Sequence, residues 1–93
     1  MSSADLRSVD LSNADLRGAN LTKVDLRGAD LIGANLEDAI MHFAELTKAD
    51  FSGAKLNGVC LFAACLKNAR MAGIDLQKVD LTDATMPDGT IHD

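Results

Sequence analysis

The side chains that could carry chemistry are few: two cysteines, two histidines and fourteen acids in a chain of 93 residues. Cys60 and Cys65 could form a disulfide, bind a metal ion or act as nucleophiles, and His42 could serve as a base. The cysteines do not form a C-x-x-C motif, and His42 and His92 are distant in sequence. We expect no nucleophile to be paired with a base. The sequence therefore predicts no enzyme, with no catalytic, metal-binding or cofactor-binding residues and no small-molecule substrate.

A pentapeptide repeat must position these side chains. A large apolar residue, most often Leu, recurs at every fifth position from Leu6 to Ile91, and a small apolar residue, most often Ala, stands two positions before it. Along a helix, each step of one repeat would rotate the large residue by about 140°, which would scatter these residues around the helix surface. A continuous strand would send them to alternate faces. The chain must therefore bend once in each repeat.

The residues between the apolar positions suit a corner. Asp or Asn usually precedes the large apolar residue, and short side chains of this kind bond nearby backbone amides. Glycine accepts the positive φ that a tight corner requires. Six of the seven glycines share the second position after the large residue: Gly18, Gly28, Gly33, Gly53, Gly58 and Gly73.

Units such as ADLRG, ANLTK, ADLIG and ADFSG resemble the pentapeptide-repeat family, A(D/N)Lxx, from Ala4 to Asp93. The resemblance implies an all-β fold, a right-handed quadrilateral (four-sided) parallel β-helix solenoid. Four repeats would make one coil, and the chain would form about four and a half coils. We expect a single domain over residues 1–93, with repeats from residue 4 and an irregular last half coil at 84–93.

The interior of this coil is predicted to hold the large and small apolar residues of every repeat. A stacked ladder of large side chains would fill it and leave no room for a ligand. Its predicted members are Leu6, Leu26, Leu46, Leu66, Phe51, Leu56 and Leu61.

Three units, AIMHF, VCLFA and ACLKN, depart from the pattern on the outward side. With four repeats in each coil, Ile40 would stack on Cys60 and His42 on Phe62, next to Phe43. These five residues are a candidate protein-binding patch, because large apolar exposure is uncommon on soluble monomers. The alternative is that these side chains merely cover one another. In either case we expect His42 to be a stacking partner rather than a metal ligand or a base.

These features favour a non-enzymatic protein-binding or scaffolding module. Its protein partner is unknown, and end-to-end self-association, or membership of a longer solenoid, is expected because no capping unit is visible. The sequence predicts no direct nucleic-acid binding and no membrane contact. We expect a cytoplasmic location, since Asp5, Arg7 and Asp10 interrupt any apolar signal core after Met1. A corner of the coil is also expected to hold Cys60 and Cys65 beyond disulfide reach, and two free thiols suit a reducing compartment.

The resemblance offers an alternative function, that of a DNA-mimicking regulator or inhibitor of DNA gyrase of the quinolone-resistance type. Some members of the family resemble duplex DNA in width and negative charge. The net charge here is −5, but residues 51–74 contain Lys55, Lys67 and Arg70 and no acid. Duplex DNA presents about one negative charge per 1.7 Å of axis, so the density of negative charge on this surface is much lower than that of DNA.

Overall fold

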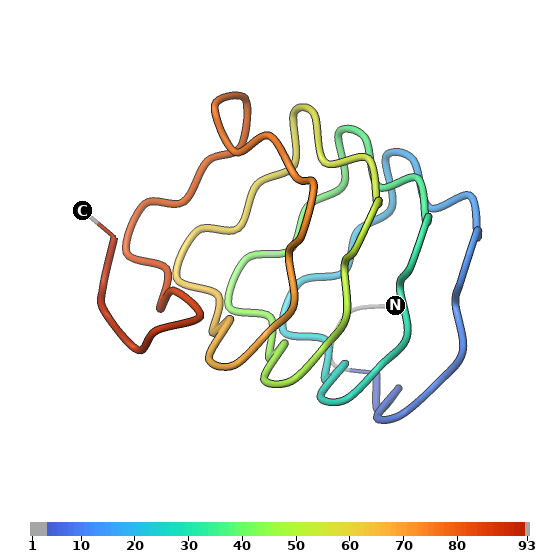
Figure 1. Cartoon of the computed structure of the whole chain (residues 1–93), viewed down its shortest axis with the longest axis horizontal. Coiled ribbons are helices and arrows are strands. Elements are labelled where there is room, and N and C mark those ends of the chain that lie inside the picture. Colours follow the sequence, from blue (N-terminus) through green and yellow to red (C-terminus); the bar gives the residue numbers. More distant parts are fainter. Residues whose placement is uncertain (1–3, 93) are drawn as a thin grey trace.

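The structure, a computed structural model, describes residues 4–92, so the predicted domain bounds at residues 1 and 93 lie outside the described part. Residues 4–92 contain no helix and no strand longer than a single paired residue. Parallel β-bridges instead join positions twenty apart, as in the pair Asp5 and Asp25. The chain therefore coils, with one turn in each such interval, and successive turns lie side by side along the longest axis (Figure 1).

Two sets of backbone hydrogen bonds join each turn to the next. The Leu6 amide donates to the carbonyl of Asp25 at 2.7 Å, and the Asp25 amide donates to the carbonyl of Ala4 at 2.9 Å. The same pattern recurs later, where the Met41 amide donates to the carbonyl of Cys60 at 2.8 Å. Peptide groups that an isolated turn would leave unpaired are thus paired between turns, so the turns stabilise one another.

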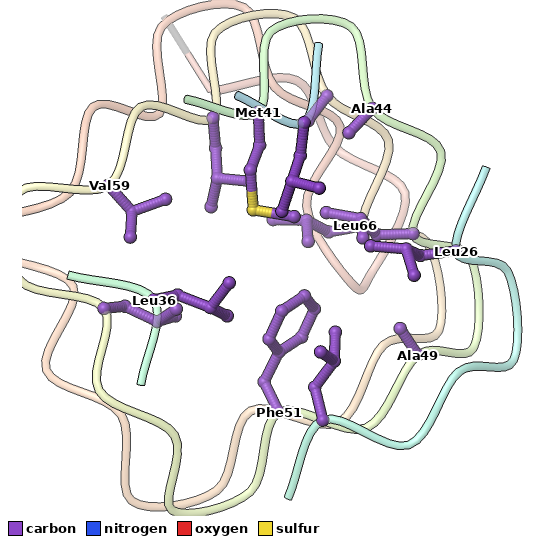
Figure 2. Close-up of a cluster of buried hydrophobic side chains, with 14 of the residues drawn as sticks. Leu26, Leu36, Met41, Ala44, Ala49, Phe51, Val59 and Leu66 are labelled. Atoms are coloured by element: carbon purple, nitrogen blue, oxygen red, sulfur yellow. The ribbon is translucent and has the colours of Figure 1, made fainter. Parts of the chain in front are cut away.

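The large and small apolar residues of the repeat fill the inside of the coil. Figure 2 shows Leu36, Met41 and Phe51 pointing from different sides toward one interior. Within the described residues no polar or charged residue is buried. Six of the predicted interior residues are buried: Leu26, Leu46, Leu66, Phe51, Leu56 and Leu61. Leu6 is only partly buried, because its turn has a neighbouring described turn on one side alone.

The predicted corner position has left-handed backbone almost throughout the coil. From Ser8 to Asp83 the second residue after each large apolar residue has a φ between 57° and 79°, except at Lys78. Gly58 shows why glycine is common there, since φ is 79° and an added Cβ would collide with the Asp38 side chain of the preceding turn. Each pentapeptide therefore repeats both the corner and the inward apolar pair.

The polar residue before each large residue fastens the same corner. Asp10 Oδ1 accepts hydrogen bonds from the backbone amide of Ser12 at 3.0 Å and from its hydroxyl at 2.6 Å. Asn35 Oδ1 accepts one from the Glu37 amide at 3.1 Å. This contact to the residue two positions later explains the frequency of Asp and Asn before the large residue.

The regular pairing fails between residues 74 and 79, which the sequence pattern does not predict. Asp75 does not pair with Lys55, although the corresponding residues pair in the preceding turns. The Gly58 amide donates to the carbonyl of Lys78 at 2.9 Å, one position later than the pattern requires. Figure 1 shows the resulting loop, in orange, larger than those at the same place in the earlier turns.

We attribute this irregularity to the inward residue at position 74. The equivalent inward residue of the preceding turns is Ala14, Ala34 or Ala54. Ile74 has a larger, branched side chain than these alanines. A close-packed interior has no room for the added volume unless the backbone moves outward. Ile74 is only partly buried, as are Met71, Leu76 and Val79 near it in the chain.

The end of the described chain folds back on the last turn. Thr85 pairs with Ile91 in an antiparallel bridge, and the His92 amide donates to the carbonyl of Ala84 at 2.8 Å. The described part of the predicted irregular segment, 84–92, therefore follows the coil as far as Pro87, whose carbonyl accepts a hydrogen bond from the Asn68 amide at 2.9 Å, and then reverses direction.

Candidate protein-binding surface

The five residues of the candidate patch lie together on two successive turns. Ile40 pairs with Cys60 through a parallel β-bridge. The rings of His42 and Phe62 meet edge to face, with centroids 5.9 Å apart and planes at 77°. Phe43 and Phe62 make a second contact of this kind at 5.7 Å and 86°. Phe62 is therefore the centre of a group that we call the aromatic patch: Ile40, His42, Phe43, Cys60 and Phe62.

Contacts within the aromatic patch cover some of its members and leave others exposed. Phe62, His42 and Cys60 are half-buried. Phe43 is 51% exposed and Ile40 is 39% exposed. Mutual cover thus accounts for the burial of Phe62, while two large apolar side chains stay accessible beside it.

Phe43 also occupies a backbone conformation that disfavours it. Its φ is 59°, in the left-handed region that Gly and Asn adopt most readily. Left-handed backbone costs a residue with a Cβ roughly 1–2 kcal/mol. Lys23 holds the same corner one turn earlier with a φ of 60°, so the conformation belongs to the coil and the aromatic side chain does not cause it. Within the part of the chain that the structure describes, the edge contact with Phe62 is the one stabilising interaction of the Phe43 side chain, and half of that side chain stays exposed.

The expectation that no nucleophile is paired with a base is wrong at Cys60. His42 Nε2 lies 2.9 Å from Cys60 Sγ, and Cys60 Sγ lies 3.6 Å from Asp80 Oδ2. Positions 42 and 60 become diagonal neighbours because their separation falls just short of one full turn, and sequence motifs for catalytic pairs do not contain this spacing. The expected stacking role of His42 is also present, since its ring rests on Phe62.

Asp80 takes part in this group mainly through its own corner. A hydrogen bond from the Thr82 hydroxyl, at 2.7 Å, is the largest cause that lowers the pKa of Asp80. The Cys60 thiol and the charge of His42 lower the pKa further. Asp80 therefore carries a stable negative charge next to the cysteine.

Cys65 occupies the same repeat position on the adjacent side, with different neighbours. Its Sγ lies 3.5 Å from the Thr47 hydroxyl, and both cysteines are free thiols. Among residues 4–92, no three His, Cys, Asp or Glu side chains are grouped closely enough to hold a metal ion, and no pocket opens. The same part of the chain includes no helix of the length and apolarity that a membrane span needs.

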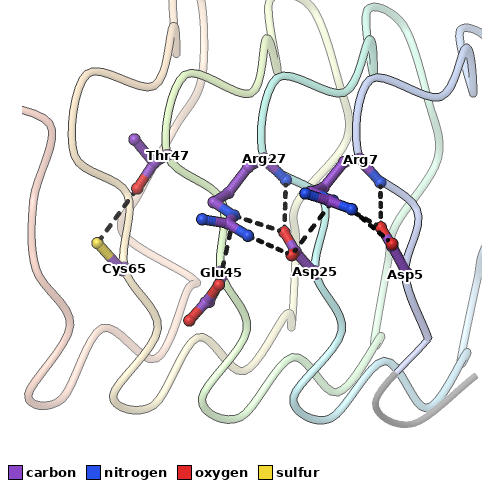
Figure 3. Close-up of polar contacts among 7 residues, drawn as sticks. All are labelled: Asp5, Arg7, Asp25, Arg27, Glu45, Thr47 and Cys65. Carbon is purple, nitrogen blue, oxygen red and sulfur yellow. Dashed lines mark hydrogen bonds and ion pairs between the residues drawn. The ribbon is translucent and has the colours of Figure 1, made fainter.

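Arginine and acidic side chains alternate along the side that contains Cys65 (Figure 3). Arg7 Nη2 lies 2.9 Å from Asp5 Oδ2, and Arg27 Nη2 lies 2.7 Å from Asp25 Oδ2. Arg27 Nε lies 3.4 Å from Glu45 Oε2 in the next turn. The hydrogen bond from Arg7 is the main reason that the pKa of Asp5 falls to about 2. We call Asp5, Arg7, Asp25, Arg27 and Glu45 the ion-pair ladder; its acids are largely neutralised by neighbouring guanidinium groups.

The regular turns, their parallel pairing and their apolar interior define an all-β solenoid repeat protein of the β-helix kind. The chain belongs to the pentapeptide repeat family, since the family model for pentapeptide repeats matches residues 1–38 and 25–61 with eight copies. Proteins of this family are in general non-enzymatic repeat modules. No curated protein sequence matches the chain.

Solved structures of the same family are similar to the chain. HetL, involved in heterocyst differentiation regulation in the cyanobacterium Nostoc sp. strain PCC 7120, shares 33% identity over 97% of this chain, with a TM-score of 0.58. Rfr23 of the cyanobacterium Cyanothece 51142 shares 33% identity over 100% of the chain, with a TM-score of 0.52. The chain spans 52% of HetL and 60% of Rfr23.

A third similar structure bears on the fold alone. QnrB1, a plasmid-mediated fluoroquinolone resistance protein, has a TM-score of 0.81 and 22% identity over 89% of this chain and 44% of its own. At this identity the likeness concerns the course of the backbone, and the surface residues must be judged on their own.

Proposed function

We propose that this chain is a non-enzymatic protein-binding or scaffolding module and that the aromatic patch is its binding surface. The observation that carries the proposal is Phe43, which is 51% exposed and holds a left-handed corner that favours Gly or Asn. Other residues with a Cβ hold the same corner, so the exposure of Phe43 next to Ile40 is what distinguishes it, and large apolar side chains exposed side by side are best explained by a contact with another molecule. Aromatic residues with neighbouring aliphatic ones are typical of the centre of protein interfaces.

The charges around the aromatic patch indicate the chemistry of the partner. Lys23 precedes Phe43 by one turn, and Asp80 and Asp83 lie one turn beyond Cys60 and Ala63. A partner should therefore present an apolar centre, with an acidic group toward Lys23 and a basic group toward Asp80. Charges of this kind orient a partner and speed its encounter.

The finer description of the fold belongs to the same proposal. We infer a right-handed quadrilateral coil of about four and a half turns, supported by four bridge positions in each of the first three described turns, at Asp5, Asp10, Asp15 and Asn20 in the first. Such a coil has flat sides on which equivalent residues of successive turns stack. The aromatic patch would occupy one of these sides.

The test compares a patch variant with an exposed apolar residue elsewhere. Tagged wild-type protein and the Phe62→Asp and Ile32→Asp variants are used to isolate partners, which are identified by mass spectrometry. Ile32 is 44% exposed but lies beside the row of Asp10, Asp30 and Asp50 rather than in the patch. We expect a partner that binds wild type and Ile32→Asp and is lost with Phe62→Asp. If both variants retain every partner and oligomeric state, the patch is not the binding surface.

End-to-end self-association is a further part of the proposal. Asp5, Asp10 and Asp15 each pair with one neighbour among residues 4–92, whereas Asp25 and Asp30 pair with two. The edge of the first described turn could therefore accept a second copy of the chain. Size-exclusion chromatography with light scattering tests this, because a monomer at high concentration would count against it. A cytoplasmic location also remains part of the proposal, in keeping with two free thiols.

DNA mimicry against gyrase is the weaker proposal for this chain. Three acids, Asp5, Asp15 and Asp25, are each paired with an arginine two positions later. The longest extent of 29 Å corresponds to about eight or nine base pairs. A supercoiling assay decides the question: we expect gyrase to be unaffected over a wide range of protein concentration, and concentration-dependent inhibition would favour the mimic.

A further inference from the structure

We propose that Cys60 is a nucleophilic thiol that exchanges with low-molecular-weight disulfides, and that His42 accepts its proton. The proposal rests on the pairing of a thiol with an imidazole, which nothing in the repeat architecture requires. It is independent of the partner-binding role, since it concerns a reaction of Cys60 with a small molecule.

The geometry is that of a nucleophile beside its base. His42 Nε2 lies 2.9 Å from Cys60 Sγ, within reach for proton transfer. The edge contact with Phe62, at 5.9 Å between centroids, holds the imidazole ring in place. Cys60 is half-buried rather than buried, so the residue is partly open to the solvent from which a small disulfide would approach.

Asp80 completes the electrostatic surroundings of the pair. Its Oδ2 lies 3.6 Å from Cys60 Sγ. Transfer of the proton from Cys60 to the neutral form of His42 leaves the summed charge of the three groups unchanged, because a thiolate and an imidazolium replace two neutral groups. The imidazolium at 2.9 Å attracts the thiolate, whereas the Asp80 carboxylate at 3.6 Å repels it, so His42 and not Asp80 is the group that stabilises the charged pair.

The reaction is a thiol–disulfide exchange. The Cys60 thiolate attacks one sulfur of a disulfide RSSR, the S–S bond of the reagent breaks, and a new S–S bond joins Cys60 to one half. The other half leaves as a thiolate and takes the proton from His42. Cys60 is thereby oxidised and the leaving half is reduced, so the products are the mixed disulfide and RSH.

Cys65 is a matched control within the same molecule. It has the same repeat position, the same half-buried environment and a polar neighbour at the same sequence offset as His42 has from Cys60. That neighbour is Thr47, a hydroxyl that cannot accept the proton as an imidazole does. We therefore expect Cys65 to react as an ordinary thiol.

The experiment measures the rate of each cysteine at about pH 7 with oxidised glutathione and with 5,5′-dithiobis(2-nitrobenzoate). Wild-type protein is quenched at intervals by alkylation, and fragment-ion mass spectrometry assigns the modification to Cys60 or Cys65. We expect Cys60 to react at least about tenfold faster than Cys65. This is less than the rate increase of about a hundredfold or more that a positioned general base typically gives. His42→Phe keeps an aromatic ring against Phe62 but has no nitrogen, and should reduce the Cys60 rate to that of Cys65.

A transferred base provides the complementary test. Thr47→His places an imidazole beside Cys65 at the offset that His42 has from Cys60, and should raise the Cys65 rate toward that of Cys60. Thermal unfolding of each variant, followed by circular dichroism, shows whether the fold is kept at the temperature of the assay. Equal rates for the two cysteines in wild type, or an unchanged Cys60 rate in folded His42→Phe, would overturn the proposal.

Discussion

The side of the coil that contains the aromatic patch and the side that contains the ion-pair ladder share one backbone geometry and differ in their outward residues. The amide of Leu26 donates to the backbone carbonyl of Glu45 at 2.9 Å on the ladder side, and the amide of Met41 donates to the backbone carbonyl of Cys60 at 2.8 Å on the patch side. Charged pairs and aromatic rings are thus equally compatible with the pairing of turns. The inward residues and the corners determine the fold, and the outward positions are free to carry function.

The largest expected effect comes from exchanging an inward position for a charged one. Leu46 is buried with 0% exposure, so Leu46→Lys places an unpaired ammonium group in the interior. We expect a loss of at least about 4 kcal/mol, a large part of the stability of a small domain. Thermal unfolding followed by circular dichroism measures this loss.

The matched outward change is made on the same turns. Arg27 belongs to the ion-pair ladder, its side chain is 48% exposed, and Arg27→Ser should leave the thermal midpoint nearly unchanged. Equal sensitivity at positions 27 and 46 would contradict the division into inward and outward residues.

The part of the fold that sequence could predict is the part that repeats. Every fifth residue from Leu21 to Leu66 is buried because each occupies an equivalent place in the coil, so one argument about period applies to all of them. The aromatic patch could be assembled from the period of the coil in the same way, since residues one period apart must stack. Because the repeat is regular, contacts between residues distant in sequence can be predicted from the number of positions that separate them.

The features that sequence did not predict depend on side-chain volume and direction. Ile74 fits the apolar pattern, and only its size relative to Ala54 indicates that the coil must widen. The contact of His42 with Cys60 runs diagonally between turns and depends on how both side chains are rotated. Thr47 and Cys65 are in contact at the same separation, two positions less than a full turn. A search of the sequence for reactive residues at that separation would therefore have found His42 and Cys60.

The second prediction concerns the corner at Phe43. Phe43→Asn should change the free energy of unfolding by less than about 1 kcal/mol, because Asn tolerates the left-handed backbone better but the edge contact with Phe62 is lost. It should also abolish binding of the partner that depends on Phe62. Stability is measured by urea unfolding and binding by recovery of the partner.

Lys23→Asn is the control for that corner. Lys23 has nearly the same φ, at 60°, and lies outside the aromatic patch. This variant should be stabilised by about 1 kcal/mol, since it loses no aromatic contact, while partner binding is kept. If Phe43→Asn lowered the free energy of unfolding by about 2 kcal/mol or more, Phe43 would have a mainly structural role and the argument for a binding surface would weaken.

The third prediction asks whether an inward residue alone can alter the course of the backbone. Ile74→Ala restores the residue type found at positions 14, 34 and 54. We expect Asp75 to pair with Lys55, and the amides of Leu56 and Asp75 to exchange with deuterium about tenfold more slowly. Hydrogen exchange read by NMR tests this, with the Leu26 amide as an unaffected reference. Unchanged exchange at Leu56 would show that the loop has another cause.

The smallest expected effect is the response of the arginine-paired acids to low pH. The pKa values of Asp5 and Asp15 fall from 3.8 to about 2, mainly through hydrogen bonds from Arg7 and Arg17. A carboxyl with a lowered pKa in the folded state contributes stability above its unfolded value and loses that contribution as pH falls. The contribution of these pairs should therefore be complete at about pH 5 and decline between about pH 4 and pH 2.

The double variant Arg7→Gln, Arg17→Gln separates this decline from that of the other acids. Asp10 and Asp50 also have a lowered pKa, through the hydroxyl groups of Ser12 and Ser52, and those bonds remain in the variant. Wild type should therefore lose more of its thermal midpoint than the variant between about pH 5 and pH 2. The difference should shrink in about 1 M salt, since the pairs are exposed and screened. Parallel pH profiles at low salt would show that the arginines of this surface neutralise charge without stabilising the coil, and only the aromatic patch would then distinguish one side from another.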